Sequence, residues 1–114
     1  ERVIRLRKAV PDAKIILAHL GGYLLWDDVG PALPAMDVWL DTSYCLPNHP
    51  ERRERFARLI REAGPGRVLF GTDSPWAGQA EALGYTRAFL ADYGFSAEEQ
   101  AAILGENARK ILFD

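Results

Sequence analysis

The stretch RVLFGTDSPW (residues 67–76) decides how the rest of the chain is interpreted. Its apolar run, residues 68–70, is typical of a strand that is buried on both faces, as the strands of parallel sheets are. An acid, Asp73, follows this run at once, and a proline and a tryptophan follow the acid. A carboxylate at the end of a buried strand is a candidate for a chemical role, so the other strand ends need the same inspection.

Two further apolar runs also end in polar residues. KIILAH (residues 14–19) ends in His19, and DVWLDTSY (residues 37–44) ends in Asp41, Thr42 and Ser43. Helical patterns separate the three runs, so the order is a helix, three strand–helix units and terminal helices. This alternation predicts an α/β fold in which parallel strands are joined by right-handed crossovers.

Caps and helix breakers predict the helix boundaries. Pro31 and Pro34 should shorten or break a helix over residues 24–35. Two pairs of residues have capping-box spacing, Asn48 with Glu51 and Ser96 with Glu99. The remaining expectations are a helix over residues 79–93, a helix end at Gly105 and a structural role for Asn107.

Composition excludes several classes of protein. The 114 residues carry a formal net charge of −2, so no strongly basic face is available for nucleic acid. No apolar stretch is long enough to span a membrane. The single cysteine, Cys45, allows no intrachain disulfide, which favours a reducing, cytoplasmic setting. It has no histidine at a recognisable spacing, so a thiol nucleophile is not favoured.

Two architectures use this alternation, the doubly wound sheet and the (β/α)₈ barrel. The doubly wound sheet binds nucleotides through a glycine-rich loop, and HLGGYL (residues 19–24) lacks the G-x-G-x-x-G spacing. The barrel places its chemistry at the carboxyl ends of its strands. Because all three strand ends here are polar, the barrel is the favoured prediction.

Four segments together resemble the amidohydrolase-2 family, which comprises metal-dependent hydrolases and decarboxylases built as distorted (β/α)₈ TIM barrels. They are ILAHLGG, WLDTSY, VLFGTDSPW and ILGENARKIL, and the resemblance extends from about Ile15 to Leu112. It implies that residues 1–114 are the C-terminal part of a single barrel domain, with strands six to eight and the terminal helices. The barrel in this chain would therefore be incomplete.

The resemblance implies roles for two residues. Asp73 resembles the aspartate that ends strand eight, which binds the metal and accepts a proton from metal-bound water. The alternative is that Asp73 caps the following turn. His19 resembles the histidine that ends strand six, a proton carrier or substrate-polarising group that ligates a second metal in other branches of the superfamily. The alternative is a histidine held by structural hydrogen bonds.

Other residues near the strand ends are weaker candidates. The hydroxyl groups of Thr42 and Ser43 either bind substrate or satisfy backbone groups of their loop. Trp76 either forms a wall of the pocket or covers the end of the barrel. His49 is expected at the surface or as a helix cap, with a substrate contact as the alternative, and Trp26 and Trp39 are expected in the core.

The chain lacks the H-x-H pair that such enzymes carry, and His19 and His49 are its only histidines. A stable metal site usually has three or more protein ligands. Three strands also leave two sheet edges open, which favours association. The prediction is the C-terminal portion of a longer enzyme, inactive by itself, that forms a homo-oligomer or associates through its open edges.

The function expected for the longer enzyme is hydrolysis of an amide, lactone or ester bond in a small-molecule substrate by metal-activated water. Non-oxidative decarboxylation is the alternative within the family. A non-catalytic α/β module that binds a partner through its sheet edge is the alternative from another class. Zinc is the expected metal because histidine and carboxylate ligands suit it, and manganese would also fit.

Overall fold

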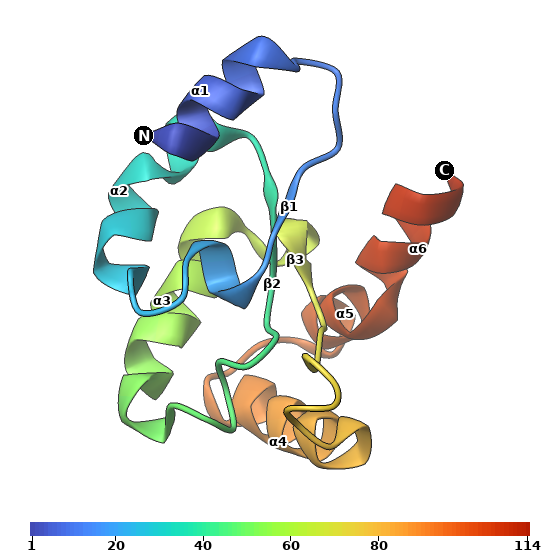
Figure 1. Ribbon diagram of the computed structural model, residues 1–114. Coiled ribbons are helices and arrows are strands. Elements are labelled where there is room, and N and C mark those ends of the chain that lie inside the picture. Colours follow the sequence, from blue (N-terminus) through green and yellow to red (C-terminus); the bar gives the residue numbers. More distant parts are fainter.

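The computed structural model describes all residues from 1 to 114 and contains one parallel sheet (Figure 1). The sheet has three strands in the order β1-β2-β3. The expected α/β class and the positions of all three strands are therefore confirmed. The strands are β1 (Ile16–Leu17), β2 (Trp39–Asp41) and β3 (Val68–Leu69).

Each strand is shorter than the apolar run that predicted it. Past Leu69, for example, the backbone N–H of Phe70 donates to the carbonyl of Ile103, 2.9 Å away, and no longer to a neighbouring strand. Beyond β3 the chain is only partly buried, and this hydrogen bond goes to a helical segment. Apolar runs record burial, whereas strand limits depend on which segment supplies the hydrogen-bond partner.

Helices surround the sheet, with α2 and α3 packed together on one side and α5 and α6 on the other (Figure 1). Short 3₁₀ turns, η1 (His19–Gly21), η2 (Pro50–Arg52) and η3 (Pro65–Arg67), lie in the connections. No helix is both long enough and apolar enough to cross a membrane. The helices are α1 (Arg2–Ala9), α2 (Trp26–Met36), α3 (Arg53–Ala63), α4 (Gln79–Asp92), α5 (Ala97–Ala101) and α6 (Asn107–Phe113).

The two faces of the sheet have different environments. Leu17, Leu40 and Val68 lie in register across the three strands, and they contact the apolar core formed with α2 and α3. Successive residues of a strand point to opposite faces. Ile16 and Asp41 therefore face the other way, toward α6, where they line a shallow hollow with apolar residues of that helix. Ile16 remains 43% exposed there, so this second face is only partly covered.

Helix α2 differs from the prediction at its prolines. It runs without a break through Pro31 and Pro34, although neither residue can donate a backbone hydrogen bond. Its length of 11 residues agrees with the expected short helix. Trp26 and Met36 are buried at its two ends, and their packing against the core offsets the missing bonds.

The predicted capping box at Ser96 is confirmed, whereas the predictions for Asn48 and Gly105 are wrong. Ser96 and Glu99 form the expected capping box, with hydrogen bonds of 3.1 and 2.9 Å. Asn48 caps no helix, because the N-cap position of the 3₁₀ turn η2 is His49, and its side chain makes no capping hydrogen bond. Gly105 does not end a helix either. It lies in a π-helical turn, η4 (Ala102–Glu106), that joins α5 to α6, and the bond from Phe70 to Ile103 ties this wide turn to the sheet.

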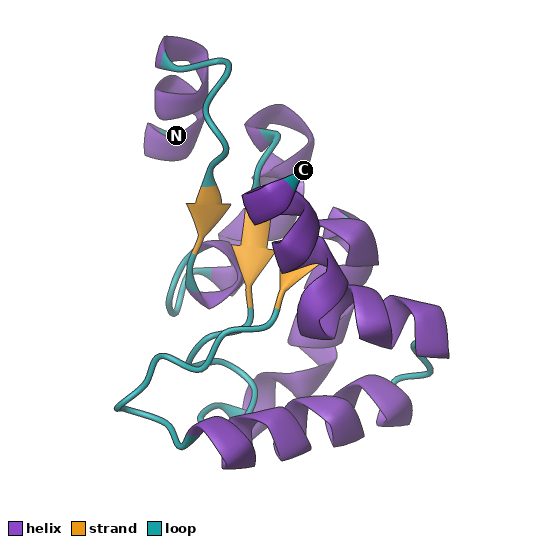
Figure 2. Cartoon of the chain, turned by 90° about the vertical axis from the view of Figure 1, so that its right-hand side faces the viewer, coloured by secondary structure: helices purple, strands orange, loops and turns teal.

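The carboxyl ends of all three strands point to the same end of the molecule (Figure 2). The loops that follow them gather there, next to α4. Asn107 fixes the opposite, amino end of β3, because its buried side-chain amide donates to the carbonyls of Pro65 and Val68 at 2.7 and 2.9 Å. The predicted structural role of Asn107 is thus confirmed, and the strand ends are the place where distant polar residues meet.

Candidate active site

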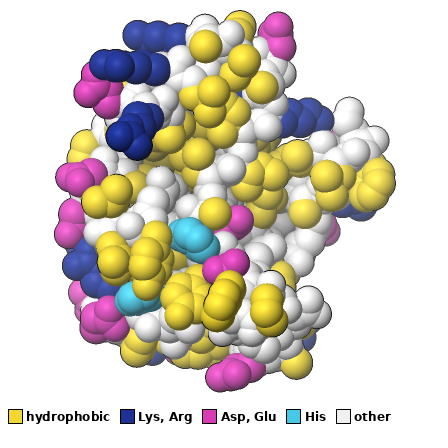
Figure 3. All heavy atoms as spheres, viewed as in Figure 1, with side chains coloured by type: hydrophobic (Ala, Val, Ile, Leu, Met, Phe, Trp, Pro, Cys, Tyr) yellow, Lys and Arg dark blue, Asp and Glu magenta, His cyan; other side chains and the backbone are white.

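The loops after the strands enclose an open hollow of about 260 Å³. Histidine, acidic and aromatic side chains gather on this face of the molecule (Figure 3). The structure therefore brings His19 and Asp73, the two principal candidates from the sequence, into one site. The lining residues are His19, Tyr23, Tyr44, Asp73 and Trp76.

The ring of His19 is held in one orientation by the backbone of the middle strand's loop. Its Nδ1 lies 2.8 Å from the carbonyl oxygen of Ser43. A carbonyl oxygen can only accept a hydrogen bond, so Nδ1 carries the proton. In the neutral ring, Nε2 is then the nitrogen with a free lone pair. This nitrogen can accept a proton or bind a metal ion.

Asp41, at the end of β2, braces the loop that carries His19. Its Oδ1 accepts hydrogen bonds from the backbone N–H groups of His19 and Ser43, at 3.2 and 2.9 Å, and from the Ser43 hydroxyl. Asp41 also ends an apolar run of the sequence, although it is not among the site residues predicted above. The signal is the same as for Asp73, a carboxylate at the end of an apolar run.

The hydroxyl groups of Ser43 and Thr42 both contact protein atoms. That of Ser43 donates to Asp41 and lies 3.2 Å from Nδ1 of His19, so Ser43 supports the histidine. Thr42 is buried, and its Oγ1 accepts a hydrogen bond from the N–H of Gly71 at 3.2 Å. The structure thus places Thr42 in the contact between the ends of β2 and β3. Substrate binding by either residue stays a prediction.

Glycine at position 71 allows the same close contact. A Cβ atom there would lie 3.2 Å from Cβ of Ser43 and 3.4 Å from Cγ of Asp41. A larger residue would therefore require the Ser43 side chain to shift by a few tenths of an ångström.

The Asp73 carboxylate forms no hydrogen bond or ion pair with another side chain or with the backbone. The turn that follows is closed by other atoms. Oγ1 of Thr72 accepts from the N–H of Ser74 at 3.3 Å, and the Asp73 carbonyl accepts from the N–H of Trp76 at 2.9 Å. The alternative role of Asp73 as a turn cap is therefore not observed. Trp76 is 75% exposed and stands at the side of the hollow, as a pocket wall would.

Three lining residues have an uncommon backbone conformation. His19, Tyr44 and Asp73 have φ values of 58°, 53° and 60°, in the left-handed region that favours glycine. Non-glycine residues are strained there, and such strain is concentrated at functional sites. The sharp turns direct these three side chains from the strand ends into the hollow.

His49 and Tyr23 are linked to the site in a way that the sequence did not indicate. Nε2 of His49 lies 3.1 Å from the Tyr23 hydroxyl, and its Nδ1 lies 3.2 Å from Oε1 of Glu51. The His49 side chain is 17% exposed and caps no helix, so the capping role predicted for it is wrong. No spacing rule joins residues 23 and 49, because their proximity depends on the packing of two loops.

The chain does not supply a complete metal centre. No group of three or more histidine, cysteine, aspartate or glutamate residues is placed to hold a metal ion. Asp73 could supply its unpaired carboxylate and His19 one unpaired ring nitrogen, and these two ligands are fewer than a stable site requires. Cys45 is no substitute, because burial raises the pKa of its thiol far above the usual range.

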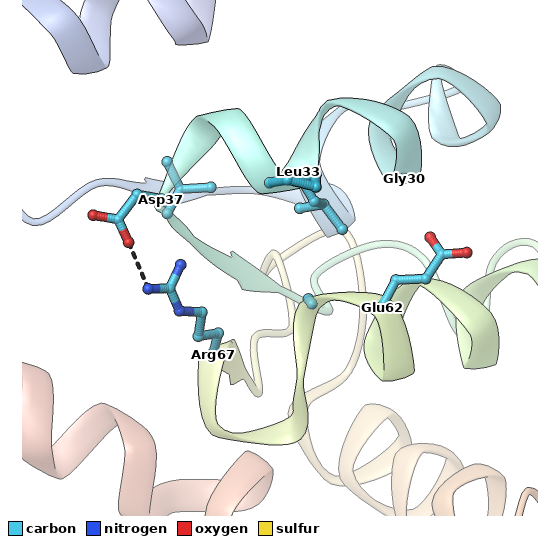
Figure 4. Close-up of a pocket in the computed structure, with 8 residues that line it drawn as sticks. Gly30, Leu33, Asp37, Glu62 and Arg67 are labelled. Carbon is cyan, nitrogen blue, oxygen red and sulfur yellow. Dashed lines mark hydrogen bonds and ion pairs between the residues drawn. The ribbon is translucent and has the colours of Figure 1, made fainter.

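A larger hollow of about 610 Å³ lies at the opposite ends of the strands (Figure 4). Asp37 precedes β2 and Arg67 precedes β3, and their side chains form an ion pair with each other. The hollow thus lies at the amino ends of the strands, where barrel enzymes have stability roles and no chemistry. The larger hollow is therefore not the candidate site, although its volume is greater.

Comparison with known proteins places this geometry in a family. The sequence profile of the amidohydrolase family matches residues 3–113. The chain therefore belongs to the amidohydrolase family, as its four motifs predicted. No curated protein matches its sequence.

Solved structures with the same fold include an amidohydrolase from Burkholderia multivorans with bound zinc. It has a TM-score of 0.72 and 18% identity over 95% of this chain and 46% of that one. A dihydroxybenzoic acid decarboxylase from Polaromonas sp. JS666, with bound manganese and the inhibitor 2-nitroresorcinol, has a TM-score of 0.65 and 21% identity over 96% of this chain and 38% of that one.

A third is a putative 2-pyrone-4,6-dicarboxylic acid hydrolase from Pseudomonas putida, with a TM-score of 0.62 and 22% identity over 95% of this chain and 46% of that one. The chain spans less than half the length of each of these structures. At these identities the likeness shows the fold alone. The fold is a small α/β sheet that matches part of an amidohydrolase TIM barrel.

Proposed function

We propose that the hollow is part of the active site of a metal-dependent hydrolase, in which residues 1–114 supply strands six to eight and the terminal helices of one barrel. The observation that carries this proposal is the convergence of two unpaired ligand groups. His19 and Asp73 line the same hollow, although they follow different strands, and neither Nε2 of His19 nor the Asp73 carboxylate forms a hydrogen bond.

Asp73 would hold a divalent cation through one carboxylate oxygen and accept a proton with the other. When bound, such a cation lowers the pKa of a coordinated water molecule toward neutrality. Nε2 of His19 would accept a proton. In that protonated form it would donate a hydrogen bond that polarises the substrate's carbonyl, or pass the proton to the leaving group. Zinc or manganese would suit these ligands. The further ligands would come from residues beyond these 114, because this chain contains no group of three.

The walls of the hollow favour a flat, cyclic substrate. Tyr23, Tyr44 and Trp76 present aromatic rings next to the two reactive side chains. Aromatic side chains bind planar rings by stacking and edge contacts. A small ring that contains a lactone, ester or amide bond is therefore the substrate class that this lining fits best.

Decarboxylation of a hydroxylated aromatic acid is the second candidate. It is favoured by the solved structures with the same fold, several of which are dihydroxybenzoate decarboxylases. In that reaction Asp73 and His19 would manage the proton that replaces the carboxyl group on the ring. The same lining would hold the substrate.

Association is part of the proposal, because the sheet is open. Strand β1 pairs with β2 alone and so has one free edge. Residues 1–114 alone would be inactive and would associate through this edge with another copy. Light scattering at several protein concentrations would test this, and a monomer at all of them would refute it.

Metal content is the first test of the hydrolase. Elemental analysis after exhaustive buffer exchange would compare this chain with a chain extended to a complete barrel. We expect about one equivalent of metal in the extended protein, little in the shorter one, and loss of metal from extended Asp73→Asn. Asp12→Asn is the matched control, since Asp12 is exposed and has no hydrogen bond or ion pair.

Activity assays on the extended protein would then distinguish the hydrolase from the decarboxylase. Hydrolysis in a lactone panel supports the hydrolase, and loss of carbon dioxide from hydroxybenzoates supports the decarboxylase. If Asp73→Asn and Asp12→Asn retain metal and activity equally, the proposed site is refuted. If the extended protein turns over neither panel, a non-catalytic interaction module becomes the better description.

A further inference from the structure

We propose that Tyr23 contacts the substrate, and that His49 and Glu51 are positioning residues that fix the direction of its hydroxyl group. The proposal rests on the assignment of the hollow as a substrate site. It adds a specificity-determining residue and narrows the substrate to rings that carry a hydrogen-bond donor. Figure 3 shows both histidines of the chain on the face that contains the hollow.

A continuous hydrogen-bonded chain leads from solvent to the hollow. Oε1 of Glu51 lies 3.2 Å from Nδ1 of His49, and Nε2 of the same ring lies 3.1 Å from the Tyr23 hydroxyl. Tyr23 lines the hollow with His19 and Asp73, whereas Glu51 and His49 do not. His49 and Glu51 can therefore influence a substrate only through the tyrosine.

The hydrogen bonds that link Tyr23, His49 and Glu51 run in a definite direction. The backbone N–H of Glu51 and then His49 hold the pKa of the Glu51 carboxyl below its usual value, so this group is an ionised acceptor. Nδ1 of His49 must then donate, which in the neutral ring leaves Nε2 as an acceptor. The Tyr23 O–H donates to Nε2, and the phenol oxygen keeps its other lone pair for the hollow. That oxygen matches a ring hydroxyl or ring N–H group.

Aromatic packing keeps the tyrosine in place. Its ring centroid lies 5.7 Å from that of His19, 5.4 Å from that of His49 and 5.9 Å from that of Tyr44. Trp26 lies beneath, fully buried, and its indole N–H donates to the His19 carbonyl at 2.8 Å. Tyr23 itself is 42% exposed, so its open side remains available to a ligand.

Binding of two matched probes to the 114-residue chain tests the proposal without metal or turnover. The probes are 4-hydroxybenzoate, which donates a hydrogen bond, and 4-methoxybenzoate, which cannot. We expect the chain to prefer the hydroxyl probe about fivefold, the discrimination that one ordinary hydrogen bond gives. NMR titration would measure both affinities from backbone amide shifts around the hollow.

Tyr23→Phe should abolish the preference, and His49→Phe should reduce it. The matched control is Tyr85→Phe on α4, a tyrosine whose hydroxyl forms no hydrogen bond and whose ring lies near Arg53. It should leave the preference unchanged. Equal preference in Tyr23→Phe and the wild type, or no binding of either probe at the hollow, would overturn the proposal.

The nitrogen chemical shifts of His49 give a second readout that a purely packing role would not change. We expect a protonated Nδ1 and an unprotonated Nε2, and Tyr23→Phe should shift the Nε2 resonance while Tyr85→Phe does not. The reverse tautomer would overturn the proposed direction of the hydrogen bonds, from Tyr23 through His49 to Glu51. Because these shifts need no catalysis, failure of the hydrolase assay and failure of this proposal remain distinguishable.

Discussion

Replacement of Asp41 by alanine should destabilise the fold strongly, although Asp41 is not an apolar core residue. Its Oδ1 accepts three hydrogen bonds, from two backbone N–H groups and one hydroxyl. A hydrogen bond to a charged group contributes about 1.5–3 kcal/mol when it is well shielded. The three bonds share one atom in a partly exposed site, so their sum overstates the effect. We expect Asp41→Ala to lower the free energy of unfolding by about 3 kcal/mol.

Urea denaturation followed by far-ultraviolet circular dichroism measures this loss. For a small domain with a slope of about 1.5 kcal/mol per molar urea, the midpoint should fall by about 2 M. Asp41→Asn keeps an acceptor oxygen and should lose only about 1 kcal/mol. Asp12→Ala is the control, and its effect should stay within about 0.5 kcal/mol. If Asp41→Ala unfolds at the same urea concentration as Asp12→Ala, the brace around His19 does not contribute to stability.

Three further substitutions test other parts of the structure. Leu40→Ala removes a fully buried side chain from the central strand and should lower the free energy of unfolding by about 3 kcal/mol in the same urea assay. A loss below about 1 kcal/mol would contradict the close packing of Leu40 in the core. Asn107→Ala removes two hydrogen bonds, to the carbonyls of Pro65 and Val68, and should cost about 2 kcal/mol, whereas Asn48→Ala, at an exposed position with no cap, should cost almost nothing. The backbone N–H of Ser96 and then Arg61 lower the pKa of Glu99 from 4.5, so its stabilising effect is present above that pH and lost as the pH falls through the lowered value. Glu99→Gln should therefore be less stable than the wild type at pH 7 and similar to it in acid, and an equal difference at pH 3 and pH 7 would refute this.

The sequence predicted the parts of the fold that depend on local pattern. The three apolar runs marked the strands, and the polar residues after them marked the end of the sheet where His19 and Asp73 meet. Both were detectable because burial and strand direction are encoded within a few neighbouring residues. The helix over residues 79–93 and the cap formed by Ser96 and Glu99 followed from equally local signals.

The features that escaped prediction depend on contacts between distant segments. Gly105 looked like a helix end, but a hydrogen bond from β3 to Ile103 keeps the chain helical through this glycine. Asn48 looked like a cap, but the carboxylate expected to complete its box is hydrogen-bonded to His49. Tyr23 and His49 are joined only because the loops after β1 and β2 fold against each other. Side-chain partners across such loops cannot be read from spacing.

The left-handed turns at His19, Tyr44 and Asp73 have a consequence for how this protein can change. Glycine at each of these positions would lower the conformational free energy of the folded backbone by about 1 kcal/mol. The gain is somewhat less at the histidine and the aspartate, which tolerate the left-handed conformation better than most residues. Selection for stability alone would thus tend to replace these three residues by glycine and remove the side chains that line the hollow. A laboratory selection for thermostability alone is expected to yield a more stable protein that lacks functional side chains in the hollow. Any such selection should therefore also require ligand binding.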